Sequence, residues 1–396
     1  MVFKYYNFFA DSLIKIASHF GLEIHAPFLT IILPIGISFY TFHGLSYVID
    51  IYKNRIKAED RFVNYAVFVS FFPLLVAGPI ERATHLLPQI QEKRQFNSLK
   101  IIDGLRQILW GLFKKMVIAD NCATYANLVF DHSANYSGTG LALGAFFFSL
   151  QIYGDFSGYS DIAIGTARLF GIELVQNFSF PYFSRDIAEF WRRWHISLSS
   201  WFRDYLYIPL GGSKGRLWNK MKNVLIVFIV SGLWHGANWT YVVWGVLNAI
   251  FFLPLLLTGK HRVYMNIVAQ GKNFPTVKEL MGISTTFGLI TFAWIFFRAK
   301  SIMEAFSYIQ NMFSGLFNRA GYLQARALLC WVVGYPIMII ITAFILIEWL
   351  GRENKYAIET FGLKWKKFIR LTFYYIIIFI IFWYGGKQQQ FIYFQF

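Results

Sequence analysis

The run NVLIVFIVSGLWHGANWTYVVWGVLNAIFFLPLLLTG, residues 223–259, carries no formal charge, yet it contains an ionisable ring at His235. Its 37 residues would form a straight helix roughly 55 Å long. The hydrocarbon core of a bilayer is only about 30 Å thick, so we expect the run to break or turn. Gly232, Gly236 and Asn238 mark the expected break, because glycine tolerates special backbone angles and close packing. His235 is therefore expected at membrane depth, where an ionisable residue is a functional hypothesis by default.

The whole chain has the composition of an integral membrane protein. Of its 396 residues, 56% are hydrophobic and only 15% are charged, and the mean hydropathy is +0.45. Soluble domains carry about 25% charged residues. The apolar residues come in blocks of span length separated by short basic loops, which predicts an all-α protein with many helices crossing a lipid bilayer. The excess of 37 Lys and Arg over 21 Asp and Glu fits cytoplasmic loops, and we expect no nucleic-acid partner.

We expect one membrane domain over residues 1–396 with about ten membrane segments. The apolar segments lie near residues 27–49, 61–79, 104–119, 138–157, 158–172, 223–258 (counted as two), 279–298, 327–349 and 368–385. Further stretches, at residues 1–20, 302–316 and 180–210, combine helical apolar stripes or dense aromatics with charges. They are predicted to be interfacial or re-entrant helices rather than spans.

Loop charge predicts the orientation of the chain. Residues 80–116, which include Lys114 and Lys115, hold seven Lys and Arg, and residues 185–222 hold eight. Both stretches are expected to face the cytoplasm, because cytoplasmic loops carry the excess of Lys and Arg. The loop at residues 131–140 has neither residue type and is expected outside. These assignments predict a multi-pass membrane protein with both basic stretches on the cytoplasmic side.

Two Trp-His pairs, Trp234-His235 and Trp194-His195, are the candidate chemical groups. Burial disfavours the charged imidazolium, so His235 is expected to be neutral and able to take a proton from a substrate hydroxyl. The competing interpretation of either histidine is structural, as a ring satisfied by a neighbouring helix or by backbone. His195 belongs to a basic cytoplasmic element, and a tunnel between the two rings would join a cytosolic donor to an acceptor across the bilayer.

Other polar residues in apolar surroundings admit structural roles. Asp155 and Asp161 must pair or face a cavity, and Arg168 is a candidate partner for either carboxylate. The cysteines, Cys122 and Cys330, lack the spacing of a metal site, and we expect no metal. The sequence also lacks the H-E-x-x-H, Walker A, G-x-G-x-x-G and G-x-S-x-G motifs of common soluble enzymes.

Five ordered motifs give the chain a resemblance to a known family. They are FPLLVAGPIER (72–82), QIYGDFSGYSDIAIG (151–165), FWRRWHISLSSWFRDYLYIPLGG (190–212), SGLWHGANWTYVVWG (231–245) and AWIFFRA (293–299). Together they closely resemble the membrane-bound O-acyltransferase (MBOAT) family. Within it the sequence is similar to the bacterial alginate O-acetylation branch, with the D-alanyl transfer protein of teichoic acids as a more distant relative.

The resemblance implies a many-helix ring around a central funnel, with the essential histidine of the family at His235 and its second histidine at His195. It implies transfer of an acyl group, acetyl in this branch, to hydroxyls of an exported polysaccharide such as alginate, together with separate periplasmic acetyltransferase proteins. Members of the branch begin with further hydrophobic helices ahead of a segment like FKYYNFF, which here starts at Phe3. We therefore expect the first helices of the family to be absent from this sequence.

The donor is expected to be acetyl-CoA or another activated acyl carrier from the cytosol, acting as a substrate with no bound cofactor. The basic residues Arg192, Arg193, Arg203, Lys214 and Arg216 are candidates to attract its phosphates, against the simpler interpretation of ordinary loop charge. The full set of candidate binding residues is Arg203, Asp204, Trp234 and Asn238. The alternatives are a transporter or channel for polysaccharide, lipid or acyl groups and an inactive membrane scaffold.

Overall fold

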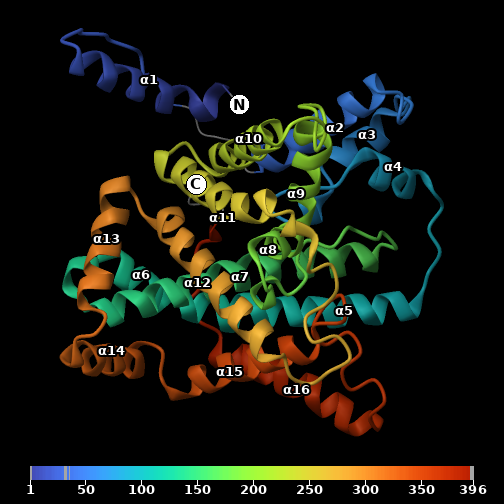
Figure 1. Cartoon of the computed structure of the whole chain (residues 1–396). Coiled ribbons are helices and arrows are strands. Elements are labelled where there is room, and N and C mark those ends of the chain that lie inside the picture. The colour runs from blue at the N-terminus through green and yellow to red at the C-terminus, as the bar shows by residue number, and fades with distance from the viewer. Residues whose placement is uncertain (1, 31–33, 35, 393–396) are drawn as a thin grey trace.

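The computed structural model describes residues 2–30, 34 and 36–392, and every regular element within these ranges is a helix (Figure 1). The α-helices are α1 (Val2–His19), α2 (Ile37–Tyr52), α3 (Phe62–Val69), α4 (Ala83–Gln91), α5 (Ser98–Leu112), α6 (Asp120–Asp131), α7 (Gly138–Leu169), α8 (Ile187–Arg193), α9 (Ile196–Phe202), α10 (Leu217–His235), α11 (Trp239–Leu257), α12 (Val277–Arg298), α13 (Ile302–Gly315), α14 (Arg319–Val332), α15 (Tyr335–Leu350) and α16 (Lys367–Tyr384). Two π-helical segments, η2 (Phe113–Ala119) and η5 (Arg203–Tyr207), extend α5 and α9, and short 3₁₀ turns include η4 (Pro181–Phe183). The predicted all-α class is confirmed.

The centre of the fold is a pair of long helical rods that run side by side (Figure 1). One rod is continuous from α5 through η2 to α6, and the other is α7, a single helix of 32 residues. The prediction of two segments at 138–157 and 158–172 was therefore wrong. Asp155 and Asp161 both lie on this continuous helix and are paired with lysines of η2.

Glycines let the two rods approach closely. A Cβ on Gly111 would lie 2.6 Å from the carbonyl oxygen of Gly158, and a Cβ on Gly104 would lie 2.7 Å from that of Gly165. Small residues at such contacts bring helix backbones together in membrane proteins. Two glycine pairs one heptad apart thus hold α5 against α7.

Substituting Gly111→Ala should destabilise the protein by about 1–3 kcal/mol, because the added methyl group forces the rods apart. Gly288→Ala on α12 is the matched control, since a Cβ there meets no atom within 4 Å. The free energy of unfolding of the Gly288→Ala control should rise by up to about 1 kcal/mol, because alanine has a higher helix propensity than glycine. Thermal unfolding in detergent should show a lower melting temperature for Gly111→Ala and a higher one for Gly288→Ala than for the wild type. Equal melting temperatures of the two variants would contradict the packing role of Gly111.

Three described helices, α11, α12 and α16, are long and apolar enough to cross a bilayer. The helices α14 and α15 pass the same test together but bend by 91° at their junction, so they form one broken span or a re-entrant loop. These boundaries match the predicted segments at 279–298 and 368–385 to within two residues. The apolar segment predicted at 27–49 lies partly outside the described residues.

The charge-free run breaks where its length predicted. Helix α10 ends at His235, extended backbone follows at Gly236, and α11 begins at Trp239. The two helices pack as a hairpin, and a Cβ on Gly232 would lie only 2.2 Å from the carbonyl oxygen of Tyr241. The segment 180–210 consists of the short elements η4, α8, α9 and η5 rather than a span. This short-helix segment packs against the core between α7 and the α10–α11 hairpin.

Candidate active site

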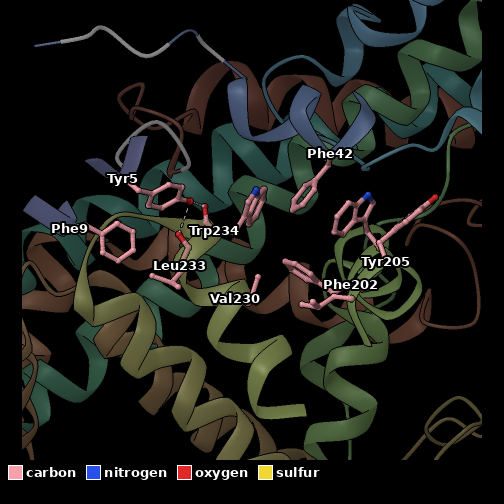
Figure 2. A pocket seen from close by; sticks show the side chains of 10 residues that line it. Tyr5, Phe9, Phe42, Phe202, Tyr205, Val230, Leu233 and Trp234 are labelled. Atoms are coloured by element: carbon pink, nitrogen blue, oxygen red, sulfur yellow. Dashed lines mark hydrogen bonds between the residues drawn. The ribbon is translucent and has the colours of Figure 1, made fainter. Parts of the chain in front are cut away.

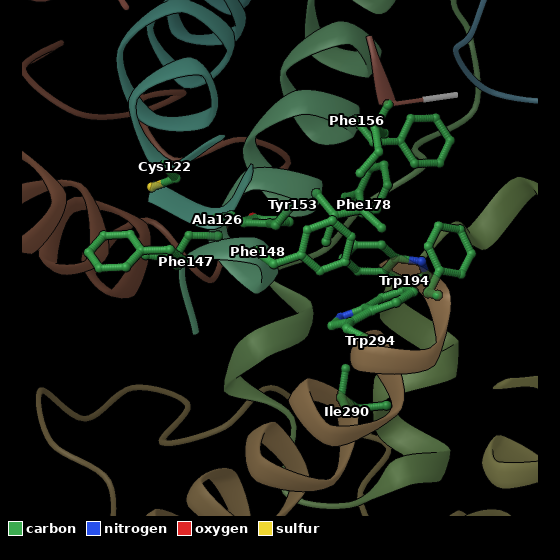
Figure 3. Packing of buried hydrophobic residues seen from close by; sticks show 14 of the residues in the cluster. Cys122, Ala126, Phe147, Phe148, Tyr153, Phe156, Phe178, Trp194, Ile290 and Trp294 are labelled. Carbon is green, nitrogen blue, oxygen red and sulfur yellow. The ribbon is translucent and has the colours of Figure 1, made fainter. Parts of the chain in front are cut away.

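The buried core contains a dense set of aromatic rings drawn from several elements (Figure 3). Trp194 packs on Trp294 of α12 with ring centroids 5.1 Å apart, and on Phe178 at 5.0 Å. Phe178 in turn contacts Phe156 of α7, again at 5.0 Å. The two candidate histidines lie along the edge of this aromatic cluster.

His235 occupies the last position of α10 and is 6% exposed. Its ring packs edge-on against Trp234, Trp244 and Phe297, with centroid distances of 4.8, 5.1 and 5.2 Å. The tight α10–α11 hairpin supplies two of these rings and α12 the third. The buried position beside a helix break, which the sequence predicted, is confirmed.

His195 is the N-cap of α9 and is 1% exposed. Its ring packs edge-on against Phe156 at 4.6 Å and lies 6.1 Å from the centroid of Trp234. The Nδ1 atom lies 3.0 Å from the Oδ1 atom of Asn177. Burial lowers the pKa of His195 well below its usual value, with a smaller effect in the same direction from His235, so the ring is neutral at physiological pH.

The structure thus brings the two predicted histidines together around one indole. Trp234 contacts the rings of both His195 and His235, although these residues come from different segments of the chain. The backbone oxygen of Trp234 accepts a hydrogen bond from Nζ of Lys4 at 3.1 Å. Trp234 is therefore the shared wall of a two-histidine centre.

The remaining predicted binding residues lie farther out. Arg203 is largely exposed and pairs with its neighbour Asp204 at 2.7 Å, while Asp204 also pairs with Arg82 at 2.9 Å. Asn238 caps α11 by accepting from the backbone N–H of Thr240. The Nδ2 group of Asn238 also donates to the carbonyl oxygen of Lys300 at 2.9 Å, and the role of these three residues in binding stays a prediction.

A basic cavity of about 590 Å³ opens on the α8–α9 side of the α10–α11 hairpin. Its lining combines aromatic and aliphatic residues with the cationic side chains of Arg192, Arg203, Lys220 and Arg262. Trp191 forms part of this lining and contacts Trp244 at 5.7 Å, and Trp244 contacts His235. Two successive ring contacts therefore connect the basic cavity with the buried histidine.

A second cavity, of about 370 Å³, borders Trp234 and carries no charged side chain (Figure 2). Tyr5 and Phe9 reach it from α1, Phe42 from α2, and Phe202 from α9. The hydroxyl of Tyr5 donates to the carbonyl oxygen of Leu233 at 2.9 Å. Most of the residues that line this cavity are apolar, which suits an apolar group.

The buried charges pair differently from our prediction. Lys114 pairs with Asp161 at 2.5 Å and Lys115 with Asp155 at 2.6 Å. Arg168, the candidate partner, binds Asp103 instead.

Lys114 was therefore wrongly counted as a loop charge, because it is 3% exposed and lies on η2 facing α7. The carboxylates of α7 are structural partners of the first rod. Among the described residues no three His, Cys, Asp or Glu side chains form a group that could hold a metal ion.

Sequence reasoning missed the segment 385–392, which follows α16 and lines the core near α7. The backbone N–H of Ile392 donates to Oδ2 of Asp155 at 2.8 Å, and that of Gly386 donates to the carbonyl oxygen of Met116. Phe391 packs on Tyr159 at 5.3 Å and on Phe156 at 6.4 Å. The polar run QQQ before FIY hid this docking, since such a run usually indicates an exposed tail.

Comparison with known proteins places this site in a family. Residues 53–273 match the profile of the membrane-bound O-acyltransferase family, and this match covers more than half of the chain. The chain belongs to the MBOAT family. The matched range includes both Trp-His pairs, so the family assignment rests on the part of the chain that builds the two-histidine centre.

Three relatives show the range of the likeness. A probable alginate O-acetylase of Pseudomonas aeruginosa is 37% identical over 357 residues, which cover 89% of this chain and 65% of the relative. A peptidoglycan O-acetyltransferase of Helicobacter pylori is 38% identical over 338 residues, covering 78% and 61%. A teichoic acid D-alanyltransferase of Bacillus subtilis is 29% identical over 236 residues, covering 57% and 60%. The chain thus spans less than two thirds of the length of these relatives.

Proposed function

We propose that this chain is a membrane-bound O-acyltransferase that moves an acetyl group from a cytosolic thioester donor to a hydroxyl of an exported polysaccharide. The single observation that carries the proposal is the meeting of His235 and His195 at Trp234 inside a family whose named members transfer acyl groups. Alginate and peptidoglycan are the acceptors in the names of two relatives. A cell-surface glycan of this class is the acceptor that we propose here.

In the proposed step the oxygen of the acceptor hydroxyl attacks the carbonyl carbon of the thioester. The carbon–sulfur bond breaks, an ester carbon–oxygen bond forms, and the proton of the hydroxyl passes through His235 to the leaving thiolate. A neutral imidazole is needed to take that proton, and the aromatic walls around His235 keep water away from the reacting atoms. His195 is the second polar side chain of the two-histidine centre.

We propose the basic cavity as the mouth for the donor. Acetyl-CoA and carrier-bound pantetheine both carry phosphate, and guanidinium and ammonium groups such as those of Arg203 and Lys220 bind phosphate through charge-assisted hydrogen bonds. The aromatic contacts from Trp191 through Trp244 lead inward to His235. The exposed position of Arg203 on the cavity wall fits its predicted role in donor binding.

Reversing one charge on this wall should weaken donor binding without changing the chemistry. Lys220→Glu is expected to raise KM for the acetyl donor by about tenfold, which corresponds to about 1.4 kcal/mol, and to leave kcat unchanged. Lys222→Glu is the matched control, because Lys222 is an exposed residue of the same helix that does not line the cavity. Steady-state kinetics with the donor varied checks this, and equal effects of the two variants would argue against the cavity as the donor site.

We further propose that the protein is a multi-pass protein of the inner membrane, with its membrane segments in a ring around a central funnel. The basic stretches 80–116 and 185–222 would face the cytoplasm, the side from which the donor comes. Separate periplasmic acetyltransferase proteins would act with it on the polysaccharide. The long rods, the α10–α11 hairpin and the apolar α11, α12 and α16 support this arrangement.

The test of the function is acetyl incorporation by the purified chain in lipid. The protein is mixed with radiolabelled acetyl-CoA and a soluble glycan oligomer, and label in the glycan is counted after alkaline release of the ester. An acyltransferase incorporates label in proportion to enzyme. A transporter, the competing class, moves its cargo across vesicles and incorporates none.

A further inference from the structure

Asn177 lies at the meeting point of the sequence motifs, although it belongs to none of them. It sits in the loop between α7 and η4 and is fully buried. Its Nδ2 group donates to Oγ of Ser160 at 3.1 Å, and its Oδ1 atom lies 2.8 Å from Oγ of Ser197 and 3.0 Å from Nδ1 of His195. Its backbone oxygen accepts from the N–H of Ile196 at 2.9 Å. The side chain and the backbone of Asn177 therefore both hold the start of α9.

The direction of these hydrogen bonds follows from groups that can only donate. The backbone N–H of Ile80 donates to Oγ of Ser197 at 2.9 Å, so this hydroxyl is free to donate its own proton to Asn177. The backbone N–H of Ser197 also points at the same atom of Asn177, at 3.4 Å. An amide NH₂ group could accept neither bond, so the atom facing His195 is the amide oxygen.

An acceptor at this position decides where the proton of the imidazole lies. Nδ1 of His195 must carry the hydrogen to donate to Asn177, and in a neutral ring the Nε2 atom is then bare. That Nε2 atom is buried and has no hydrogen-bond partner among the residues that the structure describes. A buried lone pair of this kind is costly unless a ligand satisfies it.

The backbone of His195 is held in an uncommon conformation. Its φ of 44° and ψ of 54° lie in the left-handed region, which a residue with a side chain rarely adopts. Such a conformation persists only where surrounding interactions stabilise it, and it often marks a functional site. Here the hydrogen bonds that Asn177 accepts from the ring of His195 and from the backbone N–H of Ile196 supply that constraint.

We propose that Asn177 is the positioning residue of the two-histidine centre, and that it locks His195 with a bare Nε2 that accepts a hydrogen bond from a substrate hydroxyl. The inference rests on the proposed function for the identity of that group, a hydroxyl of the sugar acceptor. It assigns His195 to holding the acceptor and excludes it, in this tautomer, from donating to the thioester oxygen. Asn177 itself touches no reacting atom.

The tautomer is measurable without any assay of activity. Nitrogen-15 NMR of the wild-type protein labelled at histidine, with His195→Gln to assign the resonance, should show a neutral ring protonated at Nδ1. A ring protonated at Nε2 would overturn the proposal even if acetyl transfer is confirmed. The expected tautomer in a protein that incorporates no acetyl label would sink the proposed function and leave the positioning role standing.

Asn177→Asp gives a second test through the pH profile of kcat/KM for the acceptor. The introduced carboxylate keeps the bond to Nδ1 but stabilises the imidazolium, so the pKa of His195 rises. The activity of this variant should therefore fall at a higher pH than that of the wild type as the solution is made acidic, and it should recover in alkali. Asn177→Ala should lose activity by about tenfold or more at every pH, because nothing then fixes the ring.

The groups around His195 make this readout specific. The packed rings come from Phe156 of α7, Phe178 before η4 and Trp234 of α10, and none of them titrates. His235 is the titratable group whose charge acts on His195. Ser160→Ala removes only the hydrogen-bond partner of the amide nitrogen of Asn177. In this variant the acidic limb of the pH profile of kcat/KM should lie at the same pH as in the wild type. If the folded Asn177→Asp protein loses activity at the same acidic pH as the wild type, the positioning role of Asn177 is overturned.

Discussion

His235→Ala should lower acetyl transfer by about 10²–10⁴-fold, the range expected for loss of a general base. Alanine removes the one titratable side chain of residues 231–239 while leaving the aromatic walls around it. The loss should appear in kcat with little change in KM for the donor, because the basic cavity lies on the other side of Trp244. Labelled acetyl incorporation with purified protein measures it.

Two further variants separate chemistry from folding. His235→Gln nearly matches the size of the imidazole and keeps a polar group, yet it cannot take the proton and should be equally inactive. His132→Ala, at an exposed histidine after α6, should retain full activity. Wild-type activity in either His235 variant would refute the assignment of the base, and loss of the monodisperse peak in size exclusion would trace the effect to folding instead.

Lys114→Ala should destabilise the protein by about 3–5 kcal/mol, the cost of removing one partner of a buried ion pair. Lys114 pairs with Asp161 and also acts electrostatically on Glu348, so alanine leaves two carboxylates without their nearest cation. The hydrogen bonds of Glu348 from Trp110 and Tyr153 remain but carry no compensating charge. Thermal unfolding in detergent measures the loss.

The double variant Lys114→Met with Asp161→Asn removes one of the two uncompensated charges and should recover part of the lost stability. The exposed pair of Lys15 and Asp11 on α1 serves as the comparison, and Lys15→Ala should change the melting temperature very little. A Lys114→Ala protein as stable as the wild type would mean that the pair contributes nothing to holding the rods together.

The features that the sequence predicted well depend on local patterns or on simple lengths. The break after His235 follows from comparing a charge-free run with the thickness of a bilayer, and the helix of residues 277–298 is a plain apolar span. The two Trp-His pairs were recognisable as a set from their motifs. Each of these patterns spans only a few tens of residues of the sequence.

The failures share a physical cause, which is that burial of a polar residue depends on a partner far along the chain. Arg168 was the candidate partner of Asp155 and Asp161, but their partners are lysines of the other rod, about 40 residues earlier in the chain than the carboxylates. Asn177 gave no signal at all, since nothing in its own neighbourhood indicates that it faces a histidine. A polar side chain in an apolar run can therefore mean a contact between helices as well as the end of one.

The docking of residues 385–392 constrains the order in which this protein matures. Ile392 completes the hydrogen bonding of Asp155, a residue 237 positions earlier in the chain. While the intervening helices are still being synthesised, Asp155 has its ion pair with Lys115 but not the hydrogen bond from Ile392, and Phe156 lacks its contact with Phe391. Until residues 385–392 are synthesised and dock, the two central rods are therefore held together by the glycine contacts and the lysine pairs.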